Sequence, residues 1–172
     1  MTTLNERLAE LMTFIGDPRE GLPEEVFYFV SQLTPLVNVD LLIKNEAGQT
    51  LLTWREDRFY GPGWHIPGGI IRFKETYEAR IQKVAHNELG VTVCAESVPL
   101  TVNETMAEHR NIRGHFISLL FKCTLTKQPS QASLAGSGGL VKAGQWMWHD
   151  TCPSNLIKQH EMYRKFIEKN TG

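Results

Sequence analysis

The sequence lacks the features of a secreted, membrane or nucleic-acid-binding protein. No run approaches the roughly 18 apolar residues needed to span a bilayer. The start, MTTLNERLAELMTF, has no basic stretch followed by an apolar one, so we expect no signal peptide. Neither sign of charge prevails, because 18 basic and 19 acidic residues leave a net charge of −1. No global field would attract nucleic acid or a membrane, and we expect a cytoplasmic protein.

Cysteine is also scarce. The three cysteines, Cys94, Cys123 and Cys152, are far apart and form neither a Cys-x-x-Cys pair nor a zinc-ligand spacing. This predicts reduced thiols rather than a disulfide framework. What the chain does have is length and apolar content. Its 172 residues, 41% of them hydrophobic, suffice for one domain with its own core.

The sequence predicts a helical extension over residues 1–34, followed by a single domain over residues 35–172. Leucines at helical spacing predict a helix over 4–15, and two glutamates open a second over 24–33. Thr34-Pro35 ends the second helix. The extension would either cover one side of the core or pair with a second subunit, so a homodimer stays open.

From residue 36 the pattern changes to short β-rich runs separated by turns. Helices flank these strands without a regular strand–helix–strand alternation. This predicts an α/β fold of the α+β type, a mixed β-sheet sandwiched between helices. The expected strands cover 36–43, 50–54, 64–66, 91–95, 115–126 and 144–150, the helices cover 75–89 and 156–169, and 128–143 is a mobile loop.

The segment GGIIRFKETYEARIQKVAHNELGV, residues 68–91, combines a glycine turn, a helix and a glycine exit. Acidic side chains on the second half of the helix can face the glycine turn. Their oxygens suit Mg²⁺ or Mn²⁺, which can neutralise charge on a leaving diphosphate. A plain amphipathic helix is the simpler alternative, but it does not explain the shared register of Gly69, Glu75, Glu88 and Gly90.

These spacings resemble the signature of the Nudix family, with the Nudix box at residues 69–91. Five residues separate Gly69 from Glu75, and Glu88, Gly90 and Val91 fall on the signature's closing positions. The resemblance implies the Nudix fold and a hydrolase of nucleoside diphosphate derivatives. No nucleic acid or membrane partner is implied.

The box departs from the family pattern in its helix. Lys83 stands at the arginine position, and Val84 and Asn87 replace two glutamates that bind metal in the family. A multi-cation site is therefore not expected. GDP-mannose mannosyl hydrolases lack the same two glutamates, and residues 34–93 resemble that branch. Membership would imply attack of water on the anomeric carbon of a GDP-mannose-like nucleotide-sugar, with one Mg²⁺ (or Mn²⁺).

The resemblance assigns roles by position. Ile70 stands where the branch carries an arginine, and Arg72 would take over the role of that arginine. Glu75 would orient the loop and pair with Lys83. The expected site consists of the Gly68 carbonyl and Glu88 at the metal, Lys83, Glu88 and Arg72 in catalysis, and Asp40, Arg55, Phe59 and Trp64 at the substrate.

One catalytic feature of the branch is missing. Its loop before the Trp-bearing strand carries a histidine, whereas GLVKAGQWMW here has none. His65 and His109 are weaker candidates, and we expect His149 and His160 at the surface. Two alternatives therefore stay open. One is a diphosphatase that cuts a P–O bond, and the other is a Nudix-fold nucleotide-binding module without catalysis.

Overall fold

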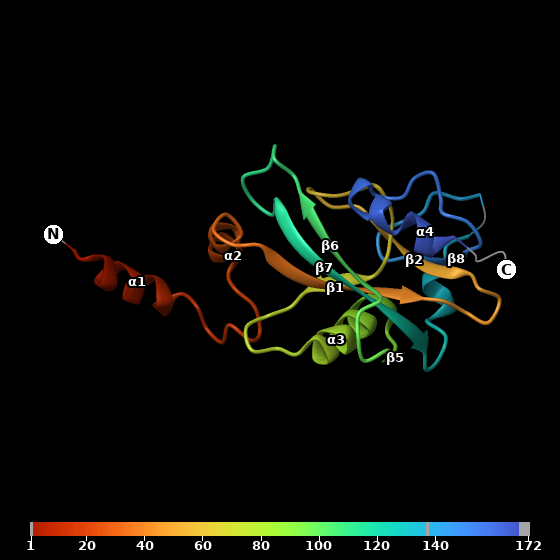
Figure 1. The fold of residues 1–172 in the computed structure, drawn as a ribbon, viewed down its shortest axis with the longest axis horizontal. Helices are drawn as coiled ribbons and strands as arrows, with labels where there is room; N and C mark the ends of the chain where they lie inside the picture. Colours follow the sequence, from red (N-terminus) through yellow and green to blue (C-terminus); the bar gives the residue numbers. More distant parts are fainter. Residues whose placement is uncertain (1, 137, 169–172) are drawn as a thin grey trace.

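Two β-sheets carry the core of the molecule in a computed structural model that describes residues 2–136 and 138–168 (Figure 1). The first sheet is mixed, because β1 and β7 are parallel while its other pairings are antiparallel. Its order is β4-β1-β7-β5, and β6 also pairs with β7. Its strands are β1 (Leu36–Ile43), β4 (Gly68–Ile70), β5 (Val93–Ala95), β6 (Thr101–Met106) and β7 (His115–Leu125).

The second sheet has three antiparallel strands in the order β3-β2-β8. They are β2 (Thr50–Arg55), β3 (Gly63–His65) and β8 (Trp146–His149). The segment between β3 and β4 links the two sheets. Gly68 and Gly69, which were expected to form a turn, begin β4 at this junction. This position matters for the site described below.

Helices cover both faces of the mixed sheet. Helix α3 (Tyr77–Leu89) packs its buried residues on β1 and β7, and the C-terminal segment covers the opposite face. Figure 1 shows α3 and α4 on opposite sides of these strands. The expected mixed sheet between helices is therefore confirmed.

Helix α3 begins two residues later than its expected start at Glu75. The Thr76 side chain caps it by accepting the N–H of Ala79, and Gly90 ends it at φ 67°. Glycine tolerates this left-handed conformation, which is common after a helix. Val84, 4% exposed, belongs to the core beneath α3. A Cβ on Gly69 would lie 2.7 Å from Val84 Cγ2, so the helix packs directly against β4 at this glycine.

The N-terminal extension contains both expected helices, α1 (Leu4–Thr13) and α2 (Glu24–Val30), the second ending three residues early. A capping box of Thr3 and Glu6 starts α1, and none of its residues is buried. Figure 1 shows α1 projecting away from the body. No helix in the described part of the chain is long and apolar enough to cross a membrane.

Three expectations about local structure were wrong or incomplete. The segment expected as one helix over 156–169 forms η2 (Lys158–Tyr163), a 3₁₀ helix, and the single turn α4 (Arg164–Ile167). The loop over 128–143 contains η1 (Gln131–Ser133), and β6 was not expected at all. Ser137 and Lys169 lie outside the described residues. Tertiary contacts of the C-terminal segment override its helical periodicity.

Candidate functional site

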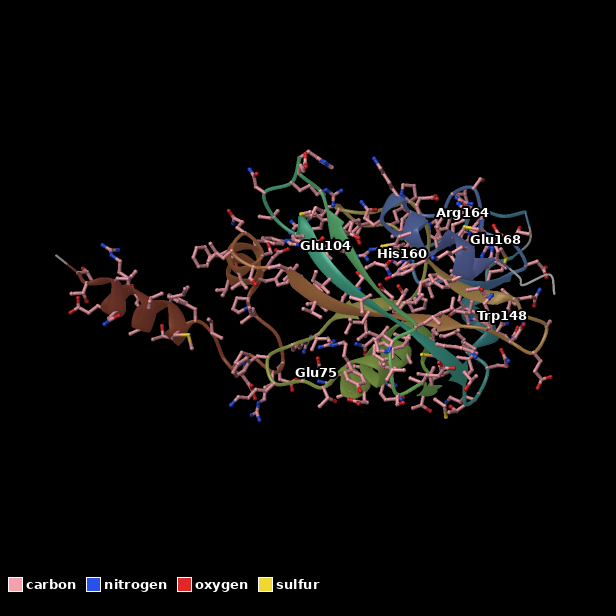
Figure 2. The ribbon with its side chains drawn as sticks, in the orientation of Figure 1. Glu75, Glu104, Trp148, His160, Arg164 and Glu168 are labelled. Carbon is pink, nitrogen blue, oxygen red and sulfur yellow. The ribbon has the colours of Figure 1, made fainter. Side chains whose placement is uncertain are left out.

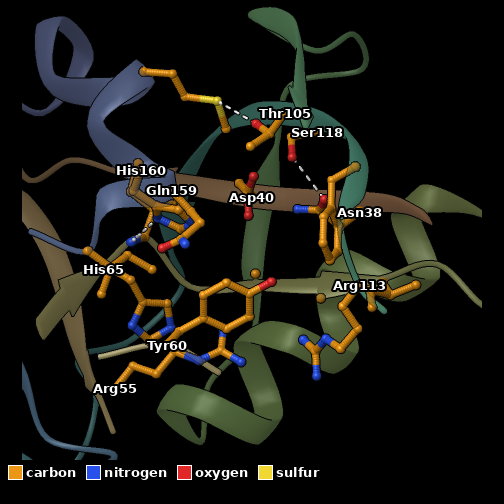
Figure 3. Close-up of a pocket in the computed structure, with 17 residues that line it drawn as sticks. Asn38, Asp40, Arg55, Tyr60, His65, Thr105, Arg113, Ser118, Gln159 and His160 are labelled. Carbon is orange, nitrogen blue, oxygen red and sulfur yellow. Dashed lines mark hydrogen bonds between the residues drawn. The ribbon is translucent and has the colours of Figure 1, made fainter. Parts of the chain in front are cut away.

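A cavity of about 200 Å³ opens between the mixed sheet, β3 and η2. Figure 3 shows Thr105, Ser118 and Asp40 on one side of it and Tyr60, Arg55 and Arg113 on the other. The first side offers uncharged hydrogen-bonding groups and one carboxylate, while the second side is cationic. The polar residues of the first side are Asn38, Asp40, Thr105, Ser118 and Gln159.

Asp40 lies on β1, two residues after Asn38, so both side chains project from the same face of the strand. Ser118 Oγ donates to Asn38 Oδ1 at 2.9 Å, and the Tyr163 O–H donates to Asp40 Oδ2 at 2.6 Å. Burial raises the pKa of Asp40 to about 7, although hydrogen bonds from Tyr163 and Asn38 act against it. A Cβ at Gly68 would overlap Asp40 Oδ1, so this strand pairing requires glycine.

Glu88 lies on the other side of Gly68. Its Oε1 accepts the Gly68 N–H at 3.0 Å, and its Oε2 accepts the Thr53 hydroxyl at 2.9 Å. His65 Nε2 lies 3.3 Å from the same Oε2. Burial raises the pKa of Glu88, but its hydrogen bonds with His65, Gly68 and Thr53 outweigh burial and hold that pKa below its usual value. The group is therefore a carboxylate at neutral pH.

The Gly68 carbonyl faces the same side of β4 as its N–H. Asp40 and Gly68 lie opposite each other on the two antiparallel strands but form a pair without backbone hydrogen bonds between them. The residues next to them make the hydrogen bonds between the strands. Both backbone groups of Gly68 therefore point away from β1. Because the N–H meets Glu88, the carbonyl is directed to the side on which Glu88 lies.

These donors limit what metal the site could hold. Within residues 2–136 and 138–168, no group of three or more His, Cys, Asp or Glu side chains is placed to bind a metal ion. Val84 is in the core and Asn87 is exposed, so neither adds a carboxylate. Glu88 and the Gly68 carbonyl fit at most one hard divalent cation, completed by water and ligand oxygens.

Two histidines border the cavity. His65 Nδ1 lies 2.9 Å from the Thr53 carbonyl, and His160 Nδ1 accepts the N–H of Ile66 at 3.0 Å. Burial, with the nearby charges of His65 and Arg55, holds the pKa of His160 well below its usual value. His160 is partly buried and His149 is 8% exposed, so the surface positions expected for both were wrong. The sequence did not indicate this because η2 brings His160 back over β3.

Lys83 and Arg72 both contact Glu75, Lys83 through an ion pair and Arg72 through its backbone N–H, and neither lines the cavity. Lys83 Nζ lies 3.2 Å from Glu75 Oε1, and the Arg72 N–H donates to Oε2 at 3.0 Å. Arg80 Nη2 is 2.6 Å from the same Oε2. Figure 2 shows Glu75 on the α3 side of the sheet and His160 on the other. The structure therefore does not bring Lys83 and Arg72 together with Asp40 and Arg55.

Of the other residues expected to bind substrate, one lines the cavity and two do not. Arg55 lines the cavity, whereas Trp64 is 3% exposed and packs in the core against Trp54, with ring centroids 5.3 Å apart. Phe59 does not line the cavity, but its ring lies 4.8 Å from the Arg113 guanidinium. Arg113 itself lines the cavity and was not among the expected residues. Its only sequence signal was a position in the RNIRG turn between two strands.

Comparison with known proteins identifies the family to which this chain is similar and solved structures with a similar fold. A family model described as the NUDIX domain matches residues 34–169. The low-salt glycan biosynthesis protein Agl8 of Haloferax volcanii is 33% identical over 112 residues, which is 63% of this chain and 70% of that protein.

Solved structures are similar in fold. A MutT NUDIX hydrolase from Burkholderia pseudomallei has a TM-score of 0.59 at 20% identity, over 80% of this chain and 99% of its own. A structure described as a UDP-X diphosphatase has a TM-score of 0.56 at 19% identity, over 94% and 74%. A NUDIX hydrolase from Nitrosomonas europaea has a TM-score of 0.53 at 11% identity, over 80% and 82%.

Proposed function

This chain belongs to the Nudix family of hydrolases, and we propose that it hydrolyses a nucleotide-sugar, releasing nucleoside diphosphate and sugar. The observation that carries the proposal is the two-sided cavity. Uncharged hydrogen-bonding groups beside Asp40 suit the hydroxyls of a sugar, and the arginines on the opposite side suit a diphosphate. GDP-mannose-like compounds are the first substrates to examine, because the box shares its two lost glutamates with the mannosyl hydrolases.

The relative named as a glycan biosynthesis protein supports a substrate that contains a sugar. The degenerate box supports the same view, since Val84 has become a core residue and one carboxylate, Glu88, remains beside Gly68. One divalent cation, Mg²⁺ or Mn²⁺, would be held by Glu88 and the Gly68 carbonyl. When bound, it would neutralise charge on the leaving diphosphate.

The protein's own groups would do the rest. Arg55 would bind the diphosphate, and Asn38, Ser118 and Gln159 would orient the sugar through hydrogen bonds. Asp40 replaces the missing loop histidine in this proposal. Tyr163 fixes its Oδ2, so the carboxylate is held in place to accept a proton from the attacking water.

A screen of nucleotide-sugars with Mg²⁺ or Mn²⁺ tests the proposal, with products identified by mass spectrometry. Hydrolysis in ¹⁸O-labelled water should place the label in the sugar. Label in the phosphate would instead establish P–O cleavage by a diphosphatase, and binding without turnover would establish a nucleotide-binding module.

Two substitutions test the roles of the carboxylates. We expect Glu88→Gln and Asp40→Asn each to lower kcat by about 100-fold or more. Asp40 lines the cavity, and Glu88 does not but accepts the N–H of Gly68, which does. Glu104→Gln is the matched control, because the exposed Glu104 side chain on β6 pairs with His115 and does not line the cavity. Full activity in either test variant would remove that residue from the mechanism.

A further inference from the structure

Three arginines converge on the ring of Tyr60 at the cationic side of the cavity. The guanidinium carbons of Arg55, Arg110 and Arg113 lie 4.7, 4.9 and 5.4 Å from its centroid. Arg55 pairs with Asp57. Among the described residues, no carboxylate oxygen lies within 4.0 Å of a side-chain nitrogen of Arg110 or Arg113. The group therefore carries an excess of positive charge where two of its members line a cavity.

Arg113 is held there at a cost. Its φ of 51° places a non-glycine residue in the left-handed region, which costs about 1–3 kcal/mol. Its backbone N–H donates to Ser31 Oγ at 3.1 Å, which ties the turn to α2. Its buried Nε has no hydrogen-bond partner among the described residues. Burial lowers the pKa of the guanidinium, as expected for a charge removed from water.

Aromatic rings fix the position of this side chain. Its guanidinium lies 4.8 Å from the Phe59 ring and 5.7 Å from the Phe27 ring. Arg110 is fixed as well, because its Nη2 donates to the Phe59 carbonyl at 2.9 Å. Strain, an unpaired donor and excess charge are all unfavourable in the free protein. A bound anion would accept a hydrogen bond from the unpaired donor and neutralise the excess charge. Guanidinium groups held in a fixed position bind phosphate oxygens well.

We propose that Arg113, assisted by Arg110 and Arg55, forms a binding subsite for the diphosphate of the substrate. The substrate then lies with its sugar toward Asp40 and its phosphates toward the turn between β6 and β7. The identity of the substrate rests on the proposed function, but the anion subsite rests on the charge and geometry of these arginines.

Inorganic pyrophosphate is the probe, titrated by calorimetry at low salt in EDTA so that no divalent cation contributes. Arg113→Asn removes the charge and suits the left-handed backbone. We expect it to weaken pyrophosphate binding by about tenfold or more, while the midpoint of thermal unfolding stays level or rises. Arg113→Lys should recover part of the affinity. A purely structural role for Arg113 would lower the midpoint instead.

Arg58→Asn is the matched control, because Arg58 lies over the same Phe59 ring at 4.9 Å but does not line the cavity. It should bind pyrophosphate as the wild type does. Equal weakening in both variants, or no binding by the wild type, would overturn the subsite.

Kinetics separate this proposal from the proposed function. With a hydrolysed nucleotide-sugar, Arg113→Asn should raise KM by about tenfold or more. Hydrolysis that does not depend on Arg113 would refute the subsite and leave the function standing. Arg113-dependent pyrophosphate binding without turnover of any nucleotide-sugar would refute the function and leave the subsite standing.

Discussion

Replacing Glu75 by glutamine should lower the free energy of unfolding by about 3 kcal/mol. The Glu75 side chain is 6% exposed and that of Arg80 is 7% exposed, so the two form a buried ion pair. Arg80 Nη2 and Nε lie 2.6 and 2.7 Å from Glu75 Oε2. Without the carboxylate, Arg80 keeps its charge in a buried position with no counterion. We take the lower end of the usual range because the glutamine oxygen still accepts hydrogen bonds.

Urea and thermal unfolding measure this loss. For a chain of this length, about 3 kcal/mol corresponds to a fall of about 6–12 °C in Tm. Glu78→Gln is the control, since Glu78 is an exposed glutamate in the first turn of the same helix, and its loss should lower Tm far less than the loss of Glu75. The double variant Glu75→Leu/Arg80→Met should recover most of the stability, because it removes both charges.

The effect should also depend on pH. Burial raises the pKa of Glu75, but hydrogen bonds with Arg72, Arg80 and Lys83 outweigh it and lower the pKa overall. The folded pKa lies below the unfolded one, so the carboxylate stabilises the protein at neutral pH and loses this effect as pH falls through the folded value. A loss under about 1 kcal/mol, or one unchanged in acid, would refute the buried-pair argument.

Three further predictions concern the cavity and the extension. Tyr163→Phe should destabilise the protein by about 1–3 kcal/mol in urea unfolding, because it removes a donor to the buried Asp40; an unchanged midpoint would contradict this. The pKa of Asp40 is raised to about 7 from 3.8, so its contribution to stability is present in acid and is lost as pH rises through 7. Between pH 4 and 8, the free energy of unfolding of Asp40→Asn should therefore rise by about 4 kcal/mol relative to that of the wild type. Parallel pH profiles of the two proteins would exclude a raised pKa at Asp40. The sequence left a homodimer open, and we propose that the exposed apolar side chains of α1 pair two subunits, so the wild type should be a dimer and Leu8→Glu a monomer by light scattering. A monomeric wild type would contradict this pairing.

Local spacing determined much of this protein. The strands at 36–43 and 115–126, the helix of the box and the glycine at its exit follow from periodicity and turn chemistry within a few residues. The register of Gly69, Glu75 and Glu88 was sufficient to indicate the Nudix family, and that resemblance implied that Glu88 lies beside Gly68, where the structure has it. The strands and the helix could be inferred because each depends on neighbours along the chain, and the family could be inferred because its signature has fixed spacings.

Tertiary structure decided the composition of the cavity. Tyr163 reaches Asp40 from 123 residues away, and His160 binds the backbone of Ile66 across 94 residues. Such contacts have no local pattern, so η2 was expected as an α-helix and His160 at the surface. Arg113 likewise joins Arg55 only because β6 and β7 pair and their turn folds over Tyr60.

The charged residues of the box show the same division. The family resemblance implied that Glu75 pairs with Lys83, and the two side chains do lie 3.2 Å apart, whereas Arg72 reaches Glu75 only through its backbone N–H. Whether the charge of Lys83 faces the cavity depended on which side of the sheet α3 occupies, and that is set by core packing. The sequence by itself therefore determined the family and the position of Glu88. Only the packed fold decided which arginines border the cavity, because that depends on contacts between distant strands and loops.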